Sequence, residues 1–501
     1  MKENTNSIIA YNTVILYVRL VILALCSLFT TRFALKALGV VDFGLFSVLG
    51  SIISFIAIFN TIMISTSNRF MAYALGKKDV KEVNEQFNIN LIIHLSIAIL
   101  TILAAFPIGN WYIHCYVNFD GNLNDAIRVF QYTVIGSVLS FVGVPYNGLL
   151  MAKEKFIVFC ATDVVAHILK LIVAYLLIYY FNDKLLIYAV SLSILTAAPT
   201  LVYFLYCKAK YSDITKFRIV KKWPKYREVL SFSSWIGFGA VASVGRNQGA
   251  ALLVNAFFNT VMNTALGVAH TVGIMVNLVA ENINKPMAPQ ITKNFAAKDY
   301  ARSYRLLTSS TKFTFLAMFL TASPFLTDCH YVLSLWLGDV PQYAVQFTIL
   351  MVIDSLVVSF NSSVSNIIFA SGKIKMYQIT VNCIRLLSIL VGYIVLNVGV
   401  PAYVLLYVYI VFSVLGVLVT QLTLEKTLKT ERSLMLKGAY LPSILVVVLF
   451  VPSLLLSHFM PPLLHILLSF VYLCLIVTYV GFNANERRYL LDFLVKLVKR
   501  N

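Results

Sequence analysis

Apolar residues occur in fourteen long blocks, separated by short polar connections. A helix of about 20 apolar residues crosses the hydrocarbon core of a bilayer, so each block predicts one membrane-spanning helix. The tightest connections lie near residues 182 and 399. The predicted spans are 10–31, 43–66, 88–108, 127–150, 156–181, 184–207, 229–256, 262–284, 307–327, 345–370, 377–397, 401–423, 440–457 and 462–482.

The composition agrees with a polytopic, all-α membrane protein. Of the 501 residues, 59% are hydrophobic and 12% are charged, whereas soluble domains contain about 25% charged residues. The 13% of aromatic residues exclude a disordered chain. The seven cysteines are scattered without paired spacing and are interpreted as small apolar fillers, so neither disulfides nor a metal site is predicted.

The net charge of +19 has three candidate explanations: a nucleic-acid partner, an anionic substrate and a signal for orientation. Lys and Arg concentrate in the termini and the even-numbered connections, which hold thirty-one of the forty. The odd-numbered connections hold only Arg32, Lys36 and Lys184. Basic residues mark the cytoplasmic side, so both termini are predicted to be cytoplasmic and no nucleic-acid partner is expected. The first span lacks a signal-peptide cleavage site and is expected to remain.

The connections leave little room for a soluble domain. The longest inner connection, 208–228, is a basic linker, and each outer connection is short. The tail 483–501 alternates apolar and basic residues, which predicts an amphipathic helix on anionic lipid, with a frayed tail as the alternative. No nucleotide-binding loop, metal-ligand pair or nucleophile motif is present. We therefore expect no enzyme activity and no cofactor.

Short segments of the chain recur in its second half. ALGVVDFG at 37–44 is similar to ALGVAHTVG at 265–273. Two further matches share an offset of 220: Lys78-Asp79 with Lys298-Asp299, and Lys153 and Lys155 with Lys373 and Lys375. The repeat predicts an N-lobe at 1–207 and a C-lobe at 229–424, each of six helices, related by a parallel pseudo-two-fold axis. Residues 425–482 then form two extra helices. Two similar lobes around a cavity are typical of alternating-access transporters.

Six basic residues fall inside predicted spans. Arg128 and Lys312 lie near span ends, where long side chains reach the interface. Arg19, Lys170, Arg246 and Arg385 lie deeper. A charge at a helix centre costs roughly 2.5–3.5 kcal/mol on insertion scales, which favours a cavity, with structural ion pairs as the alternative. Alignment of the two ALGV segments places Arg19 opposite Asn247, next to Arg246.

The acidic and polar residues inside spans are fewer. Asp163, His167 and Lys170 stand at i, i+4 and i+7 and share one helical face. That face is either a self-neutralised packing cluster or a site for a proton or cation. Glu281 is interpreted as a gate or cap residue, and Asn247 with Gln248 as polar cavity residues. A slightly positive interior favours an anion, and the planar fork of Arg binds two phosphate oxygens.

The opening pattern resembles a known family. A central Arg, then Arg32, ALGVVDFG and SNRFMAYALGKKD (67–79) are similar to bacterial polysaccharide flippases of the multidrug/oligosaccharidyl-lipid/polysaccharide exporter superfamily, closest to the O-antigen type. The resemblance implies a bacterial cytoplasmic membrane protein that moves undecaprenyl-diphosphate-linked oligosaccharides outward. It also implies a cationic cavity in the first helices and a lipid-tail groove at the last two. By position, the matching basic residues are Arg19, Arg32, Arg69 and Arg246, although Arg32 and Arg69 are also placed to anchor span ends.

The main hypothesis is therefore a flippase for surface polysaccharide, including lipopolysaccharide. Arg19 and Arg246, with Lys170 and Arg385, hold the diphosphate, and coupling to H⁺ or Na⁺ is assigned to Asp163, His167 or Glu281. Expected partners are the lipid-linked glycan, membrane lipids, a glycan polymerase and other pathway proteins. The alternatives are a multidrug or metabolite antiporter of the same fold and a membrane glycan polymerase, which would need a large outer loop.

Overall fold

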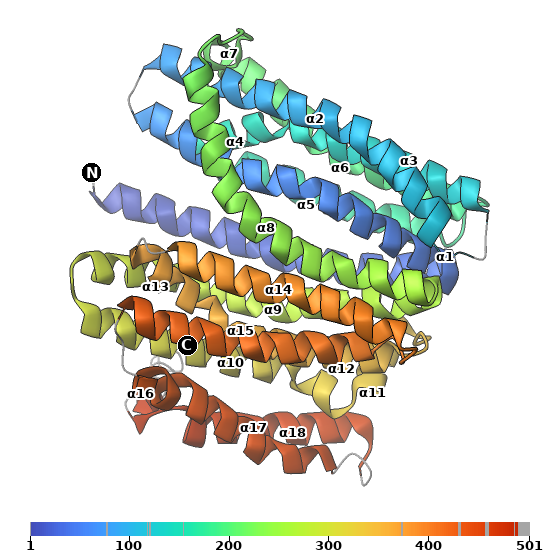
Figure 1. Cartoon of the computed structure of the whole chain (residues 1–501), viewed down its shortest axis with the longest axis vertical. Coiled ribbons are helices and arrows are strands. Elements are labelled where there is room, and N and C mark those ends of the chain that lie inside the picture. The colour runs from blue at the N-terminus through green and yellow to red at the C-terminus, as the bar shows by residue number, and fades with distance from the viewer. Residues whose placement is uncertain are drawn as a thin grey trace. The chain divides into compact units, whose positions relative to one another are not determined.

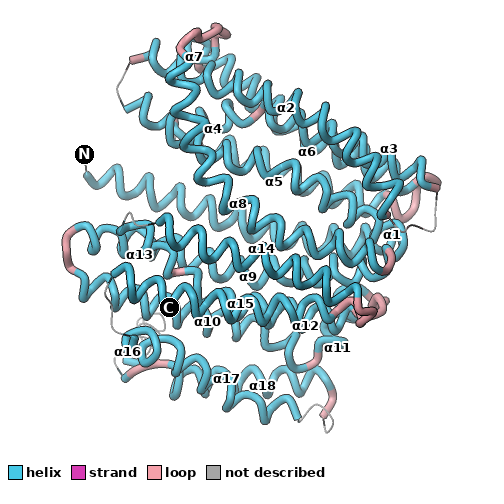
Figure 2. Tube along the Cα trace, viewed as in Figure 1, coloured by secondary structure: helices cyan, strands magenta, loops and turns pink. Residues whose placement is uncertain are grey.

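The computed structural model describes residues 2–76, 79–117, 119, 122–153, 155–371, 374–428, 432–455, 460–484 and 486–488. These residues form helices joined by short connections, as Figure 2 shows. The predicted all-α class is confirmed. The chain divides into two compact units, Met1–Gly267 and Val268–Asn501.

The first unit contains the first eight helices and the start of the ninth (Figure 1). Its boundary places α8 with the preceding helices, although the sequence assigns 229–256 to the C-lobe; the division into lobes stays a prediction. The helices are α1 (Lys2–Gly76), α2 (Val80–Tyr116), α3 (Leu123–Val142), α4 (Val144–Ala152), α5 (Phe156–Leu176), α6 (Lys184–Lys210), α7 (Ser212–Thr215) and α8 (Trp223–Phe257).

The second unit continues α9 (Thr260–Ala296) from Val268 onward. Its remaining helices are α10 (Tyr300–Thr327), α11 (Cys329–Leu337), α12 (Ala344–Ser362), α13 (Val364–Ser371), α14 (Ile374–Asn397), α15 (Val404–Leu428), α16 (Arg432–Met435), α17 (Leu441–Leu454) and α18 (Pro462–Ile476). Two short π-helical turns, η1 (Leu436–Tyr440) and η3 (Val477–Gly481), precede α17 and follow α18.

Each of the fourteen predicted spans overlaps a helix of the described chain, and residues 456 and 457 of the span 440–457 lie outside the described residues. Eleven helices are apolar and long enough to cross a membrane, and the first of them, Val18–Phe55, covers parts of two predicted spans. The predicted spans 229–256 and 307–327 lie on α8 and α10. The chain is therefore a multi-pass membrane protein.

A single glycine separates the first two predicted spans within α1. Gly39 has φ 77° and ψ 176°, a backbone conformation that side chains with a Cβ rarely adopt. Five residues later, Gly44 approaches the start of α9 so closely that an added Cβ would lie 1.8 Å from the carbonyl oxygen of Thr260. The hydroxyl of Thr264 donates to the carbonyl of Val40 at the same contact. The ALGVVDFG segment thus supplies a bend and a close helix contact.

The basic connections of the first unit meet at one end of its helices. The ends of α1 and α6 share a buried cluster with the start of α2, including Met71, Val83 and Cys207. Lys153 lies over the ring of Tyr211 at 5.6 Å. The even-numbered connections of this unit therefore lie together, as the charge alternation requires.

Helix boundaries recur at an offset of 220 residues. Asp79 accepts a hydrogen bond from the amide of Lys81 at the start of α2, and Asp299 accepts one from the amide of Arg302 at the start of α10. The break between α3 and α4 falls at Gly143, and that between α12 and α13 falls at Ser363. Helix α1 ends at Gly76 and α9 ends at Ala296. The internal repeat is confirmed at the level of elements.

The same offset corrects one equivalence drawn from the sequence. The two ALGV segments are 228 residues apart, and they lie in different places: the first at the bend of α1 and the second inside α9. With the offset of 220, Arg19 corresponds to Gly239 and Arg246 to Cys26. The pairing of Arg19 with Arg246 was therefore wrong, because a four-residue match carries less weight than a set of helix boundaries.

Two buried ionic contacts attach the C-terminal helices to α10. The ammonium of Lys312, 1% exposed, lies 2.6 Å from the carboxylate of Glu486. The imidazole of His465 contacts the carboxylate of Asp328 through Nδ1 and the carbonyl of Ser453 through Nε2. The sequence predicts that the head group of Lys312 reaches the membrane interface; the structure pairs it with Glu486, a carboxylate that follows the last predicted span.

Candidate functional site

One face of α5 carries the titratable residues Asp163, His167 and Lys170, each partly buried. The spacing i, i+4, i+7 places them on neighbouring turns of one helix face. The remaining sequence of α5 is apolar, with Val, Leu and Ile on both sides of these residues. A charged face on such a helix faces a partner or a cavity.

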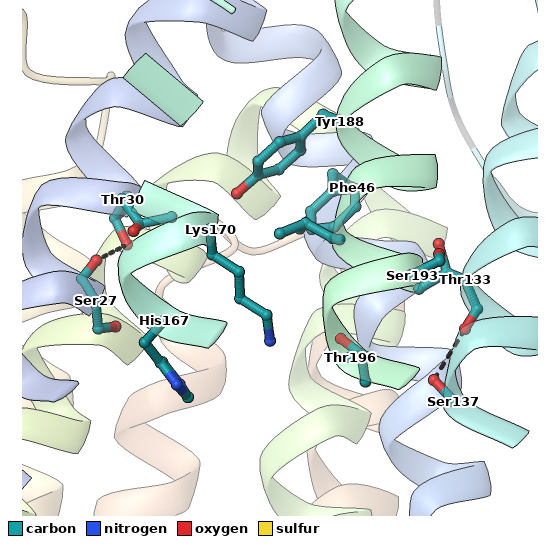
Figure 3. A pocket seen from close by; sticks show the side chains of 12 residues that line it. Ser27, Thr30, Phe46, Thr133, Ser137, His167, Lys170, Tyr188, Ser193 and Thr196 are labelled. Carbon is teal, nitrogen blue, oxygen red and sulfur yellow. Dashed lines mark hydrogen bonds between the residues drawn. The ribbon is translucent and has the colours of Figure 1, made fainter. Parts of the chain in front are cut away.

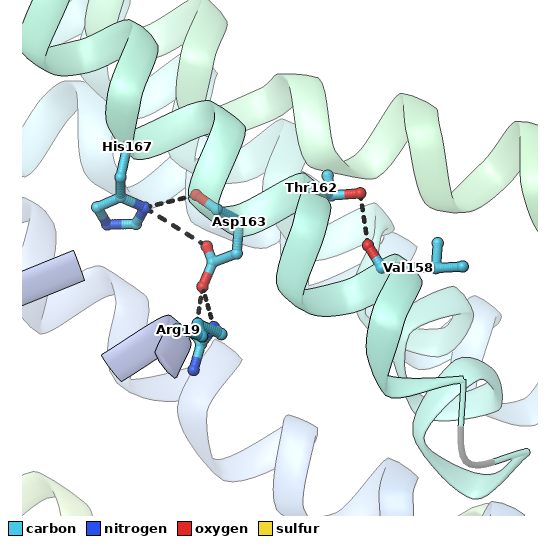
Figure 4. A network of polar contacts seen from close by, with 5 residues as sticks. All are labelled: Arg19, Val158, Thr162, Asp163 and His167. Carbon is cyan, nitrogen blue, oxygen red and sulfur yellow. Dashed lines mark hydrogen bonds and ion pairs between the residues drawn. The ribbon is translucent and has the colours of Figure 1, made fainter. Parts of the chain in front are cut away.

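Arg19 of α1 is the partner of this face. Its Nε donates to Oδ2 of Asp163 at 2.8 Å, and its Nη2 contacts the same oxygen (Figure 4). The guanidinium carbon lies 4.6 Å from the ring centroid of Phe159, one turn earlier on α5. The two side chains are 22% and 21% exposed. The positive charge of Arg19 is therefore balanced by one carboxylate and stacked on one aromatic ring.

His167 extends this cluster. Its Nδ1 lies 2.8 Å from the backbone carbonyl of Asp163 and 3.6 Å from Oδ1 of the same residue. A carbonyl oxygen can only accept, so the proton is assigned to Nδ1. The side chain of Asp163 thus lies between a guanidinium and an imidazole, which is an arrangement that can hold or pass a proton.

Lys170 extends into a pocket of about 330 Å³ beside this cluster (Figure 3). Hydroxyl groups of α1 line one side, and those of α3 and α6 line the other. Within the described part of the chain, no carboxylate lies within 4.0 Å of the Lys170 ammonium. The polar lining residues are Ser27, Thr30, Thr31, Thr133, Ser137, His167, Lys170, Tyr188, Ser193 and Thr196.

Several hydroxyl groups of the pocket donate their protons to the backbone of their own helices. Thr31, Ser137 and Ser193 each donate their proton to a backbone carbonyl four residues earlier, at 3.0, 2.9 and 2.7 Å. Each oxygen can therefore still accept a hydrogen bond from a bound group. The pocket thus combines one ammonium donor with several hydroxyl acceptors, which suits a ligand that carries both an anionic group and hydroxyls.

The other predicted residues of the first unit lie outside this pocket. Arg246 is 8% exposed on α8. Its neighbour Asn247 is exposed, and Gln248 is partly buried. Arg32 is partly buried on α1. The side chain of Arg69 lies outside the described residues.

The remaining predicted residues belong to the second unit. Arg385 of α14 donates from Nη1 to Oδ1 of Asn382, one turn earlier, at 3.3 Å. Glu281 is exposed on α9. A further carboxylate of this unit, Asp354, is buried on α12 and accepts a hydrogen bond of 2.6 Å from the hydroxyl of Ser413. The structure thus joins Arg19, Asp163, His167 and Lys170 in one place in the first unit.

The sequence did not single out the hydroxyl residues of the pocket. Their signal is the helical spacing of Thr133 with Ser137 and of Ser193 with Thr196. Hydroxyls are common in membrane helices, where they bond to their own backbone. For this reason spacing alone does not distinguish a lining residue from an ordinary one.

A match to the MatE family covers residues 16–176. No curated protein matches the sequence significantly. The residues matched by the family include α1 from residue 16 onward and all of α2 to α5, so they contain Arg19 and the charged face of α5.

Solved structures of transporters share the fold. The lipid II flippase MurJ, in an inward closed conformation, aligns with a TM-score of 0.68 at 13% identity, over 93% of this chain and 98% of that one. An inward-facing multidrug resistance MATE family transporter of the MOP superfamily aligns with a TM-score of 0.66 at 13% identity, over 83% of this chain and 99% of that one. The MATE multidrug transporter DinF-BH aligns with a TM-score of 0.61 at 16% identity, over 86% of this chain and 96% of that one. The chain therefore shares the fold of these three structures.

Proposed function

We propose that this protein flips a lipid-linked oligosaccharide with an undecaprenyl-diphosphate carrier from the inner to the outer leaflet, for surface polysaccharide of the O-antigen type. The observation that carries the proposal is the pocket of Lys170. It holds an ammonium that has no carboxylate within 4.0 Å in the described residues and that lies among hydroxyl acceptors. An ammonium binds phosphate as a point charge, and hydroxyl oxygens accept bonds from the hydroxyls of a sugar.

Arg19 contributes to binding by exchange of partners. In the structure it is paired with Asp163, and its planar fork can bind two oxygens of a phosphate in the same way. A diphosphate that enters beside Lys170 competes with Asp163 for the guanidinium. The released carboxylate then lies next to the imidazole of His167 and can take up a proton that enters the pocket from water. Arg246 and Arg385, with Arg32 and Arg69, remain proposed contacts to the anionic head group along its path.

The direction of transport follows from the membrane potential. We place both termini in the cytoplasm and the chain in a bacterial cytoplasmic membrane, because basic connections lie on the cytoplasmic side. Export of negative charge from a negative interior is favourable by roughly 2.3 kcal/mol per charge per 100 mV. H⁺ or Na⁺ coupling through Asp163, His167 or Glu281 is a separate part of the proposal, as are contacts with a glycan polymerase.

The shared fold gives additional support. The alignment with the lipid II flippase extends over 93% of this chain, and those with the two multidrug transporters over 83% and 86%. The larger aligned share with the lipid II flippase agrees with fourteen predicted spans in this chain, the last two of which lie on α17 and α18. A transporter role without enzyme activity agrees with the names of all three structures.

Multidrug export is the second candidate. It is favoured by the shared fold of two multidrug transporters and by the carboxylate of Asp163, which can bind a cationic compound when Arg19 turns away. A resistance assay with cationic compounds separates the two functions. Protection that depends on Asp163 supports drug export, whereas unchanged sensitivity supports the lipid-linked substrate.

The cellular test is substitution of Lys170. Lys170→Gln removes the ammonium and should reduce surface polysaccharide at least about tenfold at equal protein level, because the phosphate loses its point-charge partner. Lys170→Arg, which keeps the charge, should retain most output. The matched control is Arg128→Gln, because Arg128 is paired with Asp125 at 3.2 Å on α3, outside the pocket. Wild-type output from Lys170→Gln would contradict the proposed site.

A further inference from the structure

A second feature of the first unit is an apolar groove on α2 that the proposed head-group site does not use. Its larger section, of about 610 Å³, is lined by residues of α1, α2 and α8, among them Phe55, Ala104 and Leu252. Its smaller section, of about 430 Å³, is lined by α2 and the start of α8. Ile97 and Leu100 line both sections, so the two adjoin along α2 and are together called the α2 groove.

The α2 groove is as long as the hydrocarbon core is thick. Its lining residues on α2 run from Ile92 to Tyr112. At 1.5 Å per residue this distance is about 30 Å, and the hydrocarbon core is also about 30 Å thick. An acyl chain of a phospholipid reaches only through one leaflet, so one such chain fills about half of the groove. A single long hydrocarbon chain matches its full length.

The two ends of the α2 groove are polar and fixed. At one end, the hydroxyl of Tyr112 donates to the carbonyl of Leu252 at 3.2 Å and ties α2 to α8. At the other end lie Trp223 and Tyr226, whose rings stack at 6.3 Å. Aromatic rings of this type mark the border between hydrocarbon and head groups.

The aromatic end also carries positive charge. Lys222 and Lys225 both bind the carboxylate of Glu85, at 2.9 and 2.8 Å. Two ammonium groups against one carboxylate leave a net positive charge where a lipid phosphate would lie. Trp223 itself is 69% exposed, which is typical of a residue that sits in the interface.

Asparagines of α2 hold this end of the linker in place. Asn84 donates from Nδ2 to the carbonyls of Ile214 and Lys216 at 2.7 and 2.8 Å. The amide of Arg218 donates to Oδ1 of Asn88 at 2.9 Å. These bonds attach the backbone of 214–218 to α2, so the basic and aromatic residues that follow are presented at a fixed position beside the groove.

We propose that the α2 groove, in place of the groove at the last two helices that the resemblance implies, binds the polyprenyl chain of a phosphate-headed isoprenoid lipid; as the tail site of the transported substrate, this rests on the proposed function. The full-thickness groove can hold the chain while the head group is at either membrane face. The tail then keeps one binding surface during transport, and the polar head alone moves through the protein.

The test measures binding of undecaprenyl phosphate, which carries no glycan, to the purified full-length protein in detergent. Two variants fill the groove, Ala104→Phe and Leu100→Trp. The matched control is Leu103→Trp: Leu100 and Leu103 are both leucines of α2, 64% and 66% exposed, but only Leu100 lines the groove. We expect both groove variants to weaken binding at least about tenfold and the control to bind as the wild type does, with equal melting temperatures in all four proteins.

Three results would overturn the proposal. The first is that the wild type does not bind undecaprenyl phosphate, and the second is that Leu100→Trp and Leu103→Trp lose binding equally. The third is that dioleoylphosphatidylglycerol competes as well as undecaprenyl phosphate itself, which would identify the groove as a site for ordinary lipid. If one groove variant has a lowered melting temperature, the conclusion is drawn from the other groove variant and the control Leu103→Trp. The probe lacks a glycan, so the binding assay and the polysaccharide assay can fail separately. If the groove variants lose binding but Lys170→Gln leaves surface polysaccharide unchanged, the proposed function is refuted and the isoprenoid site stands. If Lys170→Gln reduces surface polysaccharide but the groove variants bind as the wild type does, only the isoprenoid site is refuted.

Discussion

At the scale of residues, the ion pair of Arg19 and Asp163 organises the charges of the first unit. A guanidinium inside a membrane helix needs a partner or water, and here it has a carboxylate and an aromatic ring. The sequence placed Asp163, His167 and Lys170 on one face and left open whether they neutralise each other or bind an ion. The structure adds Arg19 to the cluster and directs Lys170 into the pocket.

Substitutions of this pair separate its structural part from its part in transport. Arg19→Met and Asp163→Asn each leave one group unpaired, which for a buried pair costs about 3–5 kcal/mol. The two side chains are 22% and 21% exposed, so we expect the lower end of that range. The double variant Arg19→Met/Asp163→Leu leaves no charge behind and should melt near the wild type in detergent, yet make little surface polysaccharide. A double variant that melts as low as the singles would contradict this account.

The partner of Arg19 could not be predicted from the sequence. Apolar residues on all faces of a membrane helix indicate lipid and protein contacts alike, because both environments are apolar. The pattern therefore shows that α1 and α5 cross the membrane but not which faces of them meet. The same reason applies to Lys312, whose partner Glu486 lies 174 residues away.

At the scale of elements, the apolar blocks predicted the helices well. The tight junction near 182 is real, because α5 ends at Leu176 and α6 begins at Lys184. Breaks inside spans were not predicted: α3 gives way to α4 at Gly143, followed by Pro145, within one apolar block. Hydropathy averages over such a break, because the residues on both sides are equally apolar.

The glycines of α1 provide a test of how its bend is held. Gly44→Ala places a Cβ 1.8 Å from the carbonyl oxygen of Thr260, whereas a Cβ at Gly50 meets nothing within 4 Å. We expect Gly44→Ala to lower the melting temperature of the purified protein clearly. Gly50→Ala should be neutral or stabilising by up to about 1 kcal/mol, since Ala favours helix over Gly. Equal stability of the two variants would show that the contact between α1 and α9 is looser than the structure indicates.

At the scale of the whole molecule, the repeat and the charge distribution were readable from the sequence. An offset of 220 residues was present in two short matches and recurs in the helix boundaries. The match of ALGV at a different offset misled the comparison of Arg19 with Arg246. A short apolar motif recurs easily in a chain of which 59% is hydrophobic, and only the helix boundaries decide between offsets.

We interpret most of the net charge of +19 as a signal for orientation in the membrane. Thirty-one of the forty basic residues lie in the termini and the even-numbered connections, and the clusters at the ends of the helices bring such connections together within each unit. In the proposed function, the charge that acts on the substrate is small: Lys170 and the exchangeable pair of Arg19 and Asp163 hold the head group.

The most direct measurement is transbilayer movement of a polyprenyl-diphosphate oligosaccharide in proteoliposomes that contain the purified protein. We expect the wild type to move the labelled lipid from the inner to the outer leaflet faster than protein-free vesicles do, and Lys170→Gln to lose most of this rate while Arg128→Gln keeps it. Movement at the protein-free rate by the wild type, in a preparation that still melts cooperatively, would contradict the central claim.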